Sequence, residues 1–124
     1  MAGPFAYRPG FGPTPAPAGD VTISWGGRTE TLQALIDSGA SGTTIPETLV
    51  PKLALRKISE IDTSGYDGRT ARRSIYSADI VFLGFVFSKH PVVAVPRDYA
   101  LIGRDILNRY KTILDGPRLE FAVE

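Results

Sequence analysis

One short segment joins an apolar run to a carboxylate, a hydroxyl and a glycine, a combination suited to acid–base chemistry. Residues 34–36 are apolar and lead directly into Asp37, which is followed by Ser38 and Gly39. Because burial of an unpaired carboxylate is costly, an aspartate at the end of an apolar strand indicates a functional role for its side chain. Gly39 has no side chain in the way, so its amide can donate a hydrogen bond to the Asp37 carboxylate. Asp37 is therefore the main candidate for a catalytic residue.

A second segment near the end of the chain has a similar plan. Residues 100–102 are apolar, Gly103 follows, and Arg104 and Asp105 then open an expected helix. We expect the two apolar runs to lie side by side in the core, where Gly103 lets another backbone pass closely. The plainer interpretation of Asp105 is an acidic residue in the first helical turn, where it is favourable to the helix dipole. The segment is structural in either case.

Composition narrows the chemistry that the chain can perform. Its 124 residues include 14 Lys or Arg, 13 Asp or Glu, one His and no Cys, with a formal net charge of +1. The absence of cysteine excludes disulfides, thiol nucleophiles and Cys-ligated metals, and one histidine excludes multi-histidine metal sites within one chain. The balanced charge argues against a nucleic-acid partner, and no apolar run reaches the roughly 18 residues of a membrane span. With no signal-peptide pattern, we expect a soluble protein, cytoplasmic rather than secreted.

The first 19 residues differ in composition from the rest of the chain. Most of them are Pro, Gly or Ala, and they hold half of the chain's 10 prolines. Proline removes backbone donors and fixes φ, so residues 1–19 are predicted to be a flexible, extended leader. Phe5, Tyr7 and Phe11 leave open the alternative of an arm that docks on the surface. Residues 20–124 are expected to form the folded domain.

Residues 20–124 read as an all-β domain of short strands. Residues 21–25 and 28–36 are predicted to form a hairpin around Gly26-Gly27. Residues 80–87 (IVFLGFVF) are apolar on both faces and predict a fully covered central strand. Helices are expected only from residue 44, limited by Pro51, and over residues 104–110. The other expected strands cover residues 56–62, 70–78, 91–95, 111–114 and 119–123. This pattern is typical of an all-β barrel or sandwich.

Together, the two segments resemble the landmarks of the retropepsin-like aspartic peptidases. Residues 35–40 (LIDSGA), followed by residues 43–45 (TTI), are similar to the active-site signature of that family. Residues 101–107 (LIGRDIL) are similar to its second landmark, an apolar-apolar-Gly strand that leads into a helix. The D-S-G pattern alone occurs in many turns, but the ordered pair with a glycine-containing hairpin between is much more specific. The resemblance spans about residues 20–123 and implies a closed β-barrel with one short C-terminal helix.

The resemblance implies an aspartic endopeptidase that needs no metal or organic cofactor. Such peptidases activate a water between two carboxylates that share one proton. This chain has one such motif, because residues 62–65 (DTSG) match the D-S-G pattern imperfectly and follow no apolar strand. The second carboxylate must therefore come from another copy, so we expect a homodimer in which Asp37 of each chain meets its equivalent on the symmetry axis. The expected substrate is a polypeptide bound in extended conformation.

The resemblance also implies roles for the residues around the catalytic pair. Ser38, Gly39 and Ala40 would support the active-site loop, and residues 119–123 would help form a sheet between subunits. The hairpin tip would be the flap over the substrate, formed by Gly65, Tyr66, Asp67 and Gly68. The structural landmark would consist of Gly103, Arg104 and Asp105. Ser41 stands where retroviral members often carry an acidic partner for the landmark arginine, so Arg104 must bind Asp105 or a backbone carbonyl.

Several alternatives remain open at this point. The chain can be a noncatalytic retropepsin-fold module for dimerisation or peptide binding, or a segment excised from a larger precursor. His90, between Lys89 and Pro91, reads as a surface-loop residue. The arginines at 69, 72 and 73 read as a solvated face of the flap in preference to a site for acidic substrates.

Overall fold

The computed structural model describes residues 2–64 and 67–124. Within these ranges it has ten strands and two short helices. In chain order they are β1 (Ala2–Ala6), β2 (Ala18–Trp25), β3 (Arg28–Ile36), β4 (Thr44–Pro46), α1 (Leu49–Leu53), β5 (Lys57–Ser64), β6 (Thr70–Phe82), β7 (Phe85–Val95), β8 (Ala100–Ile102), α2 (Arg104–Leu107), β9 (Thr112–Asp115) and β10 (Glu120–Val123). The predicted all-β class is confirmed. Within the described ranges, no helix has the length and hydropathy needed to cross a membrane.

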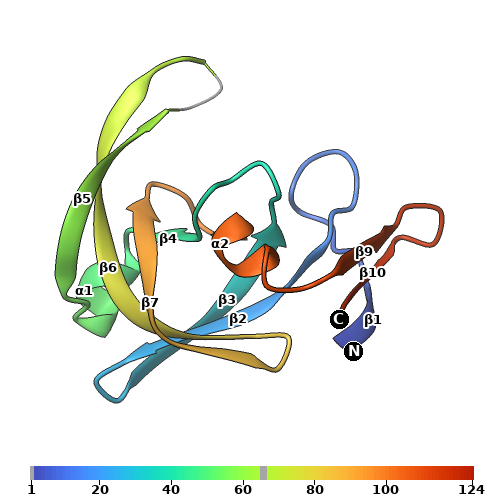
Figure 1. The fold of residues 1–124 in the computed structure, drawn as a ribbon, viewed down its shortest axis with the longest axis horizontal. Helices are drawn as coiled ribbons and strands as arrows, with labels where there is room; N and C mark the ends of the chain where they lie inside the picture. Colours follow the sequence, from blue (N-terminus) through green and yellow to red (C-terminus); the bar gives the residue numbers. More distant parts are fainter. Residues whose placement is uncertain (1, 65–66) are drawn as a thin grey trace.

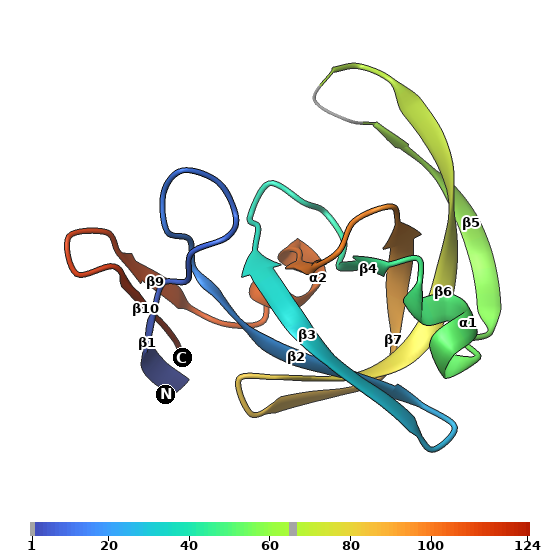
Figure 2. The same cartoon turned by 180° about the vertical axis from the view of Figure 1, so that it is seen from behind.

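Seven strands form one sheet that closes into a barrel (Figures 1 and 2). The strand order is β2-β3-β8-β4-β7-β6-β5, and a further pairing of β2 with β6 closes a ring of six strands. Strand β5 pairs with β6 outside the ring, and the β5–β6 hairpin rises above one end of the barrel. The interior is filled by apolar side chains, among them Val21, Ile23, Ala34, Ile45, Ala78, Ile80, Phe82, Val92, Ala100 and Ile102. The closed barrel expected from the sequence is therefore present.

The hairpin of β2 and β3 matches its sequence prediction. Their antiparallel register runs from Ala18 opposite Leu35 to Trp25 opposite Arg28. Gly26 and Gly27 form the turn with φ values of 55° and 82°. Glycine adopts such positive φ values without steric cost, and two of them in succession match the twist of the flanking strands.

Residues 80–87 were predicted to be one central strand, and this prediction is wrong. The chain reverses at Leu83 and Gly84, which have φ values of 53° and 85°, so that Phe82 lies opposite Phe85. Val81 and Val86 lie on the outer side of this hairpin and are 38% and 67% exposed. In a run that is apolar at every position, hydrophobic periodicity cannot locate a turn, because the two-residue period that marks a strand's faces is absent.

Both helix predictions need correction. Residues 44–46 are not a helix start but strand β4, which pairs with β7 in parallel. Helix α1 begins at Leu49 and contains Pro51 in its first turn, where the missing N–H has no intrahelical partner to lose. Helix α2 ends at Leu107 instead of residue 110, and the chain then turns toward β9.

The N-terminal segment differs from the flexible leader that its composition predicts. Strand β1 pairs antiparallel with β10, and the ring of Phe5 lies 5.3 Å from that of Phe121. Residues 8 and 16 form a further bridge, so the chain between them is a closed loop. Proline is compatible with this position because β1 is an edge strand of the sheet β1-β10-β9. The docked-arm alternative is the one that the structure supports.

Candidate functional site

Strands β3 and β8 lie side by side in the barrel, as the sequence predicted. They pair in parallel, with Ala34 opposite Ala100 and Ile36 opposite Ile102. The amide of Asp37 donates to the carbonyl of Ile102 over 3.0 Å, which continues the ladder one residue beyond β3. Asp37 therefore leaves the sheet at a position that the pairing of β3 with the buried strand β8 holds in place.

The loop after β3 fixes the carboxylate of Asp37. The Gly39 amide donates to Asp37 Oδ1 over 2.9 Å, as predicted, and the Ala40 amide donates to the Asp37 carbonyl over 3.2 Å. A Cβ at Gly39 would lie 3.1 Å from Asp37 Oδ1, closer than nearly all real contacts, so glycine leaves room for the carboxylate. The arrangement orients a partly exposed carboxylate through one of its oxygens.

The segment that begins with Gly103 holds this loop through hydrogen bonds from Arg104. The Arg104 amide donates to the carbonyl of Ala40, and Arg104 Nη1 donates to the carbonyl of Ser38, each over 2.9 Å. Arg104 thus uses a backbone carbonyl, one of the two partners expected. A Cβ at Gly103 would lie 2.6 Å from the backbone of Gly42, so the predicted close approach of another backbone is present.

A hydrogen-bonded network ties α2 to the far end of the loop. Asp105 Oδ1 accepts from Thr43 Oγ1 over 2.8 Å, and Asp105 Oδ2 accepts from the Thr43 amide over 3.1 Å. Thr43 Oγ1 in turn accepts from the Gly103 amide over 3.2 Å. His90 Nε2 lies 2.7 Å from Asp105 Oδ2. The loop after β3, strand β7 and the start of α2 meet at this one carboxylate and its threonine.

The prediction of His90 as a surface-loop residue is wrong. It lies on β7, its side chain points toward α2, and it is only 6% exposed. His90, Val92 and Ala94 are all buried, with more exposed residues between them. The sequence does not show this alternation, because residues 91–95 (PVVAV) are apolar at every position, and so it gave no signal that the histidine lies inside.

The network keeps Asp105 ionised. Burial on its own raises the pKa of this carboxyl, but hydrogen bonds from His90 and from the amide and hydroxyl of Thr43 outweigh it. The net result is a pKa below the ordinary value of 3.8. An ionised Asp105 accepts all of these bonds at once, since a carboxylate has about four acceptor sites.

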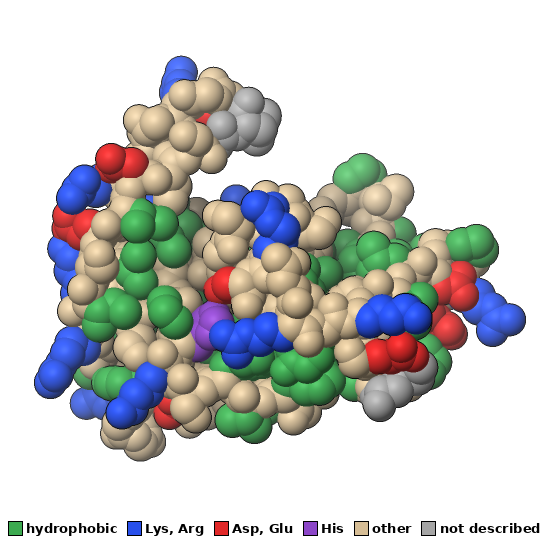
Figure 3. Space-filling model, viewed as in Figure 1, with side chains coloured by type: hydrophobic (Ala, Val, Ile, Leu, Met, Phe, Trp, Pro, Cys, Tyr) green, Lys and Arg blue, Asp and Glu red, His purple; other side chains and the backbone are tan. Residues whose placement is uncertain are grey.

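A cleft of about 490 Å³ separates the candidate catalytic loop from the β5–β6 hairpin. Figure 3 shows the hollow beneath the overhanging hairpin. Its lining comes from the loop, the hairpin, the end of β7 and β8, and comprises residues 39–42, Thr44, Ile61, Thr63, Ser64, Asp67, Arg69, Thr70, Ala71, Arg73, Val93, Val95, Arg97 and Leu101. Of the predicted flap residues, Asp67 lines the cleft and Gly68 follows it with a φ of 78°. Gly65 and Tyr66 lie outside the described residues.

The three arginines of the hairpin do not share one solvated face. Arg72 is on the outer side, with Nε 2.8 Å from Glu60 Oε2 and Nη1 3.3 Å from Asp62 Oδ1. Arg69 and Arg73 line the cleft, together with Arg97 from the segment after β7. Arg97 did not figure among the predicted site residues, because its position at the cleft depends on how β7 and the hairpin pack.

Comparisons with solved structures find the same barrel fold in several proteases. The EIAV protease, solved in complex with an inhibitor, has a TM-score of 0.63 at 20% identity, over 81% of this chain and 92% of that one. A retropepsin-like aspartic protease from Rickettsia conorii has a TM-score of 0.56 at 18% identity, covering 82% and 79%. The simian foamy virus protease has a TM-score of 0.53 at 23% identity, covering 73% and 92%. These likenesses show a retropepsin-like fold.

Residues 20–106 match the family model described as aspartyl protease. This range includes the first landmark segment, all but the last residue of the second, and most of the barrel, and it is well over half of the chain. The chain therefore belongs to the aspartyl protease family, in its retropepsin-like form. No curated protein sequence matches the chain.

Proposed function

We propose that this protein is an aspartic endopeptidase in which Asp37 from two copies of the chain forms the catalytic pair. The observation that carries the proposal is the loop after β3, where the Gly39 amide orients the Asp37 carboxylate and the next residues, 39–42, line an open cleft. Two like charges about 3 Å apart cannot both ionise cheaply, so such a pair shares one proton near its working pH. The ionised member takes a proton from water, and the protonated member polarises the scissile carbonyl.

The cleft supports a polypeptide substrate in extended conformation. Its walls offer strand edges and hydroxyls, which suit a peptide that adds as a further strand. The Asp67 and Gly68 part of the hairpin would act as the flap.

A second copy is required because each chain carries one loop of this type. A C2 axis through the loops would place the two Asp37 residues together and make the interface isologous. In the structure β10 lies between β1 and β9, so both of its edges are occupied within one chain. Residues 119–123 would therefore join a sheet between subunits only through these neighbours or after β1 has moved away.

Because both edges of β10 are already paired within one chain, a second candidate function deserves a test. This alternative is a noncatalytic module that binds peptides without completing a catalytic pair. The two functions differ in what Asp37 does. In the peptidase it is the reacting group, and in the binding module it only caps its loop.

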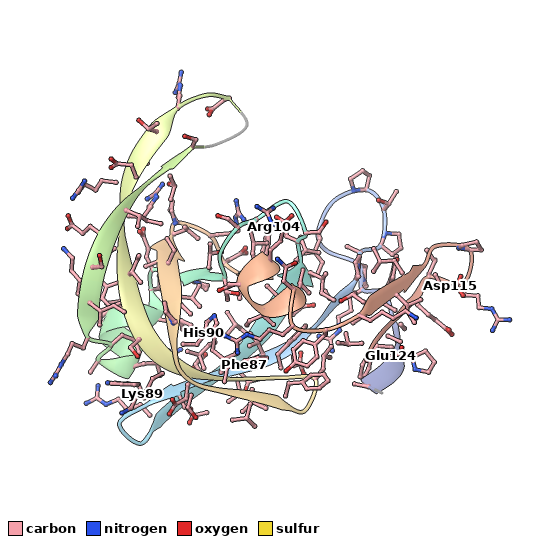
Figure 4. The ribbon with its side chains drawn as sticks, viewed as in Figure 1. Phe87, Lys89, His90, Arg104, Asp115 and Glu124 are labelled. Carbon is pink, nitrogen blue, oxygen red and sulfur yellow. The ribbon has the colours of Figure 1, made fainter. Side chains whose placement is uncertain are left out.

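The test compares the wild type with Asp37→Asn in cleavage of an unfolded protein at mildly acidic pH. Asp37→Asn keeps the side-chain volume and the acceptor for Gly39, so we expect a folded protein with cleavage reduced at least about a thousandfold. Asp115→Asn, at the end of β9 where the side chain is 41% exposed, is the matched control and should retain activity (Figure 4). Undiminished cleavage by Asp37→Asn would contradict the assignment, and peptide binding without any cleavage by the wild type would support the binding module.

The dimer requirement has its own measurement. If the site exists only in the pair, the rate per chain should rise with protein concentration until dimers dominate, in step with the mass from sedimentation. Excess Asp37→Asn chains added to the wild type should lower activity by forming mixed pairs. A rate per chain that stays constant while the protein sediments as a monomer would exclude the shared site.

A further inference from the structure

The lining of the cleft carries an excess of positive charge. Arg69, Arg73 and Arg97 contribute guanidinium groups, and Asp67 contributes the one carboxylate among the described lining residues. Arg69 Nε lies 3.9 Å from Asp67 Oδ2, so these two charges offset each other near the hairpin tip. All aspartates and glutamates of the chain are among the described residues, and none forms an ion pair with Arg73 or Arg97.

Neighbouring arginines on β6 show that this excess belongs to one face. Arg72 points outward and is paired with Glu60 and Asp62. Arg73 points to the opposite side, as successive residues of a strand do, and lies across from Ile61, which also lines the cleft. The outer face thus supplies carboxylates to Arg72, and the cleft face supplies none to Arg73.

Arg97 approaches the cleft from the opposite wall. It follows the end of β7, and its amide donates to the Val95 carbonyl over 2.9 Å in a tight turn. Its guanidinium lies 5.5 Å from the centre of the Tyr99 ring, a cation–π contact that restricts the side chain. Arg73 and Arg97 therefore border the same space from two elements that are far apart in the sequence.

We propose that the cleft selects peptides that carry an aspartate or glutamate side chain, with Arg73 and Arg97 as the specificity-determining residues. The inference rests on the proposed function, because it takes the cleft as the place where a peptide lies. A guanidinium donates two parallel hydrogen bonds to a carboxylate, which makes arginine a selective partner for acidic side chains. Uncompensated charge in a cleft also raises the local concentration of oppositely charged ligands.

Binding to the Asp37→Asn protein tests this inference without any need for cleavage. The probes are fluorescent peptides that differ only by Glu or Gln, with the acidic residue moved along an otherwise neutral sequence, and anisotropy gives each Kd. At the best position and low salt we expect the Glu peptide to bind about five- to tenfold more tightly. The preference should shrink in about 1 M salt and below about pH 4, where the glutamate of the peptide becomes protonated.

Substitution then identifies the residues responsible. Arg73→Gln and Arg97→Gln should each reduce the Glu over Gln preference, and the double variant should abolish it. Arg72→Gln is the matched control, since it removes the same charge from the outer face of the same strand. An unchanged preference in the double variant, equal binding of Glu and Gln peptides at every position, or an equal loss with Arg72→Gln would each overturn the proposal.

The failure of this inference is distinguishable from failure of the proposed function. Cleavage that depends on Asp37, with the same kcat/KM for Glu and Gln peptides, would support the peptidase function and contradict the preference for acidic peptides. Conversely, binding of Glu peptides through Arg73 and Arg97 without any cleavage by the wild type would retain the preference and remove the catalytic activity. As a positive check, Arg97→Glu should shift the preference toward peptides that carry lysine.

Discussion

Nε2 of His90 lies 2.7 Å from Oδ2 of Asp105, and this contact joins β7 to the start of α2. Asp105 also binds the amide and the hydroxyl of Thr43, which follows the loop that carries Asp37. His90 and Asp105 do not touch Asp37. They act on it as positioning residues, by holding the end of its loop against α2.

Removal of the histidine should destabilise the protein and disturb the loop. In His90→Phe, Asp105 keeps its burial but loses one hydrogen-bond donor, so we expect a cost of about 1–3 kcal/mol in the free energy of unfolding. His90→Gln retains a donor and should recover part of this loss. Urea unfolding measures both, and equal stability of His90→Phe and the wild type would show that the contact has no energetic role. A purely structural role would leave the kcat of the folded fraction unchanged, and a positioning role should lower it.

Asp105 should make stability depend on pH in the acidic range. Its pKa is lowered in the folded state by His90 and Thr43 despite burial, so the folded protein binds this proton less readily than the unfolded chain. The corresponding stability is complete above the ordinary value of 3.8 and is lost as the pH falls through the lowered pKa. The wild type should therefore exceed Asp105→Asn in free energy of unfolding at pH 6, and the gap should narrow below about pH 4. A gap that stays constant from pH 6 to pH 2 would contradict this.

Gly103 should not tolerate a side chain. A Cβ there would lie 2.6 Å from both C and O of Gly42, which are backbone atoms that cannot rotate away. We expect Gly103→Ala to cost about 2 kcal/mol or more and to move the loop that carries Asp37. Gly116→Ala is the control, because an added Cβ there meets no atom within 4 Å. Thermal unfolding compares the two, and equal effects would show that the close approach is unimportant.

The docked N-terminal arm should depend on the contact between its aromatic residue and the last strand. Phe5 is partly buried against Phe121, so Phe5→Ala should weaken the pairing of β1 with β10 by about 1–2 kcal/mol. Amide hydrogen exchange should show faster exchange in both strands, with the barrel strands unaffected. Val86→Ala, at a residue that is 67% exposed, should leave exchange in β1 unchanged. Unaltered exchange in Phe5→Ala would mean that backbone pairing alone holds the arm.

The features that the sequence predicted correctly are those whose signal is local. The hairpin of β2 and β3 follows from period-2 alternation on both sides of Gly26-Gly27. The hydrogen bond from Gly39 to Asp37 follows from a glycine placed two residues after a carboxylate that ends an apolar run. In each case neighbouring residues carry the whole pattern, because strand faces and tight turns are set by backbone geometry within a few residues.

The features that the sequence missed depend on contacts between distant segments. The Pro-rich arm is ordered because β10, more than 100 residues away, offers an edge to pair with. His90 is buried because α2 brings Asp105 to it. Arg72 and Arg73 are neighbours in the chain, yet Arg72 meets carboxylates of β5 on the outer face of the hairpin, and Arg73 lines the cleft that forms where the hairpin overhangs the loop after β3. No local pattern encodes such partners, since they come together only when the barrel closes.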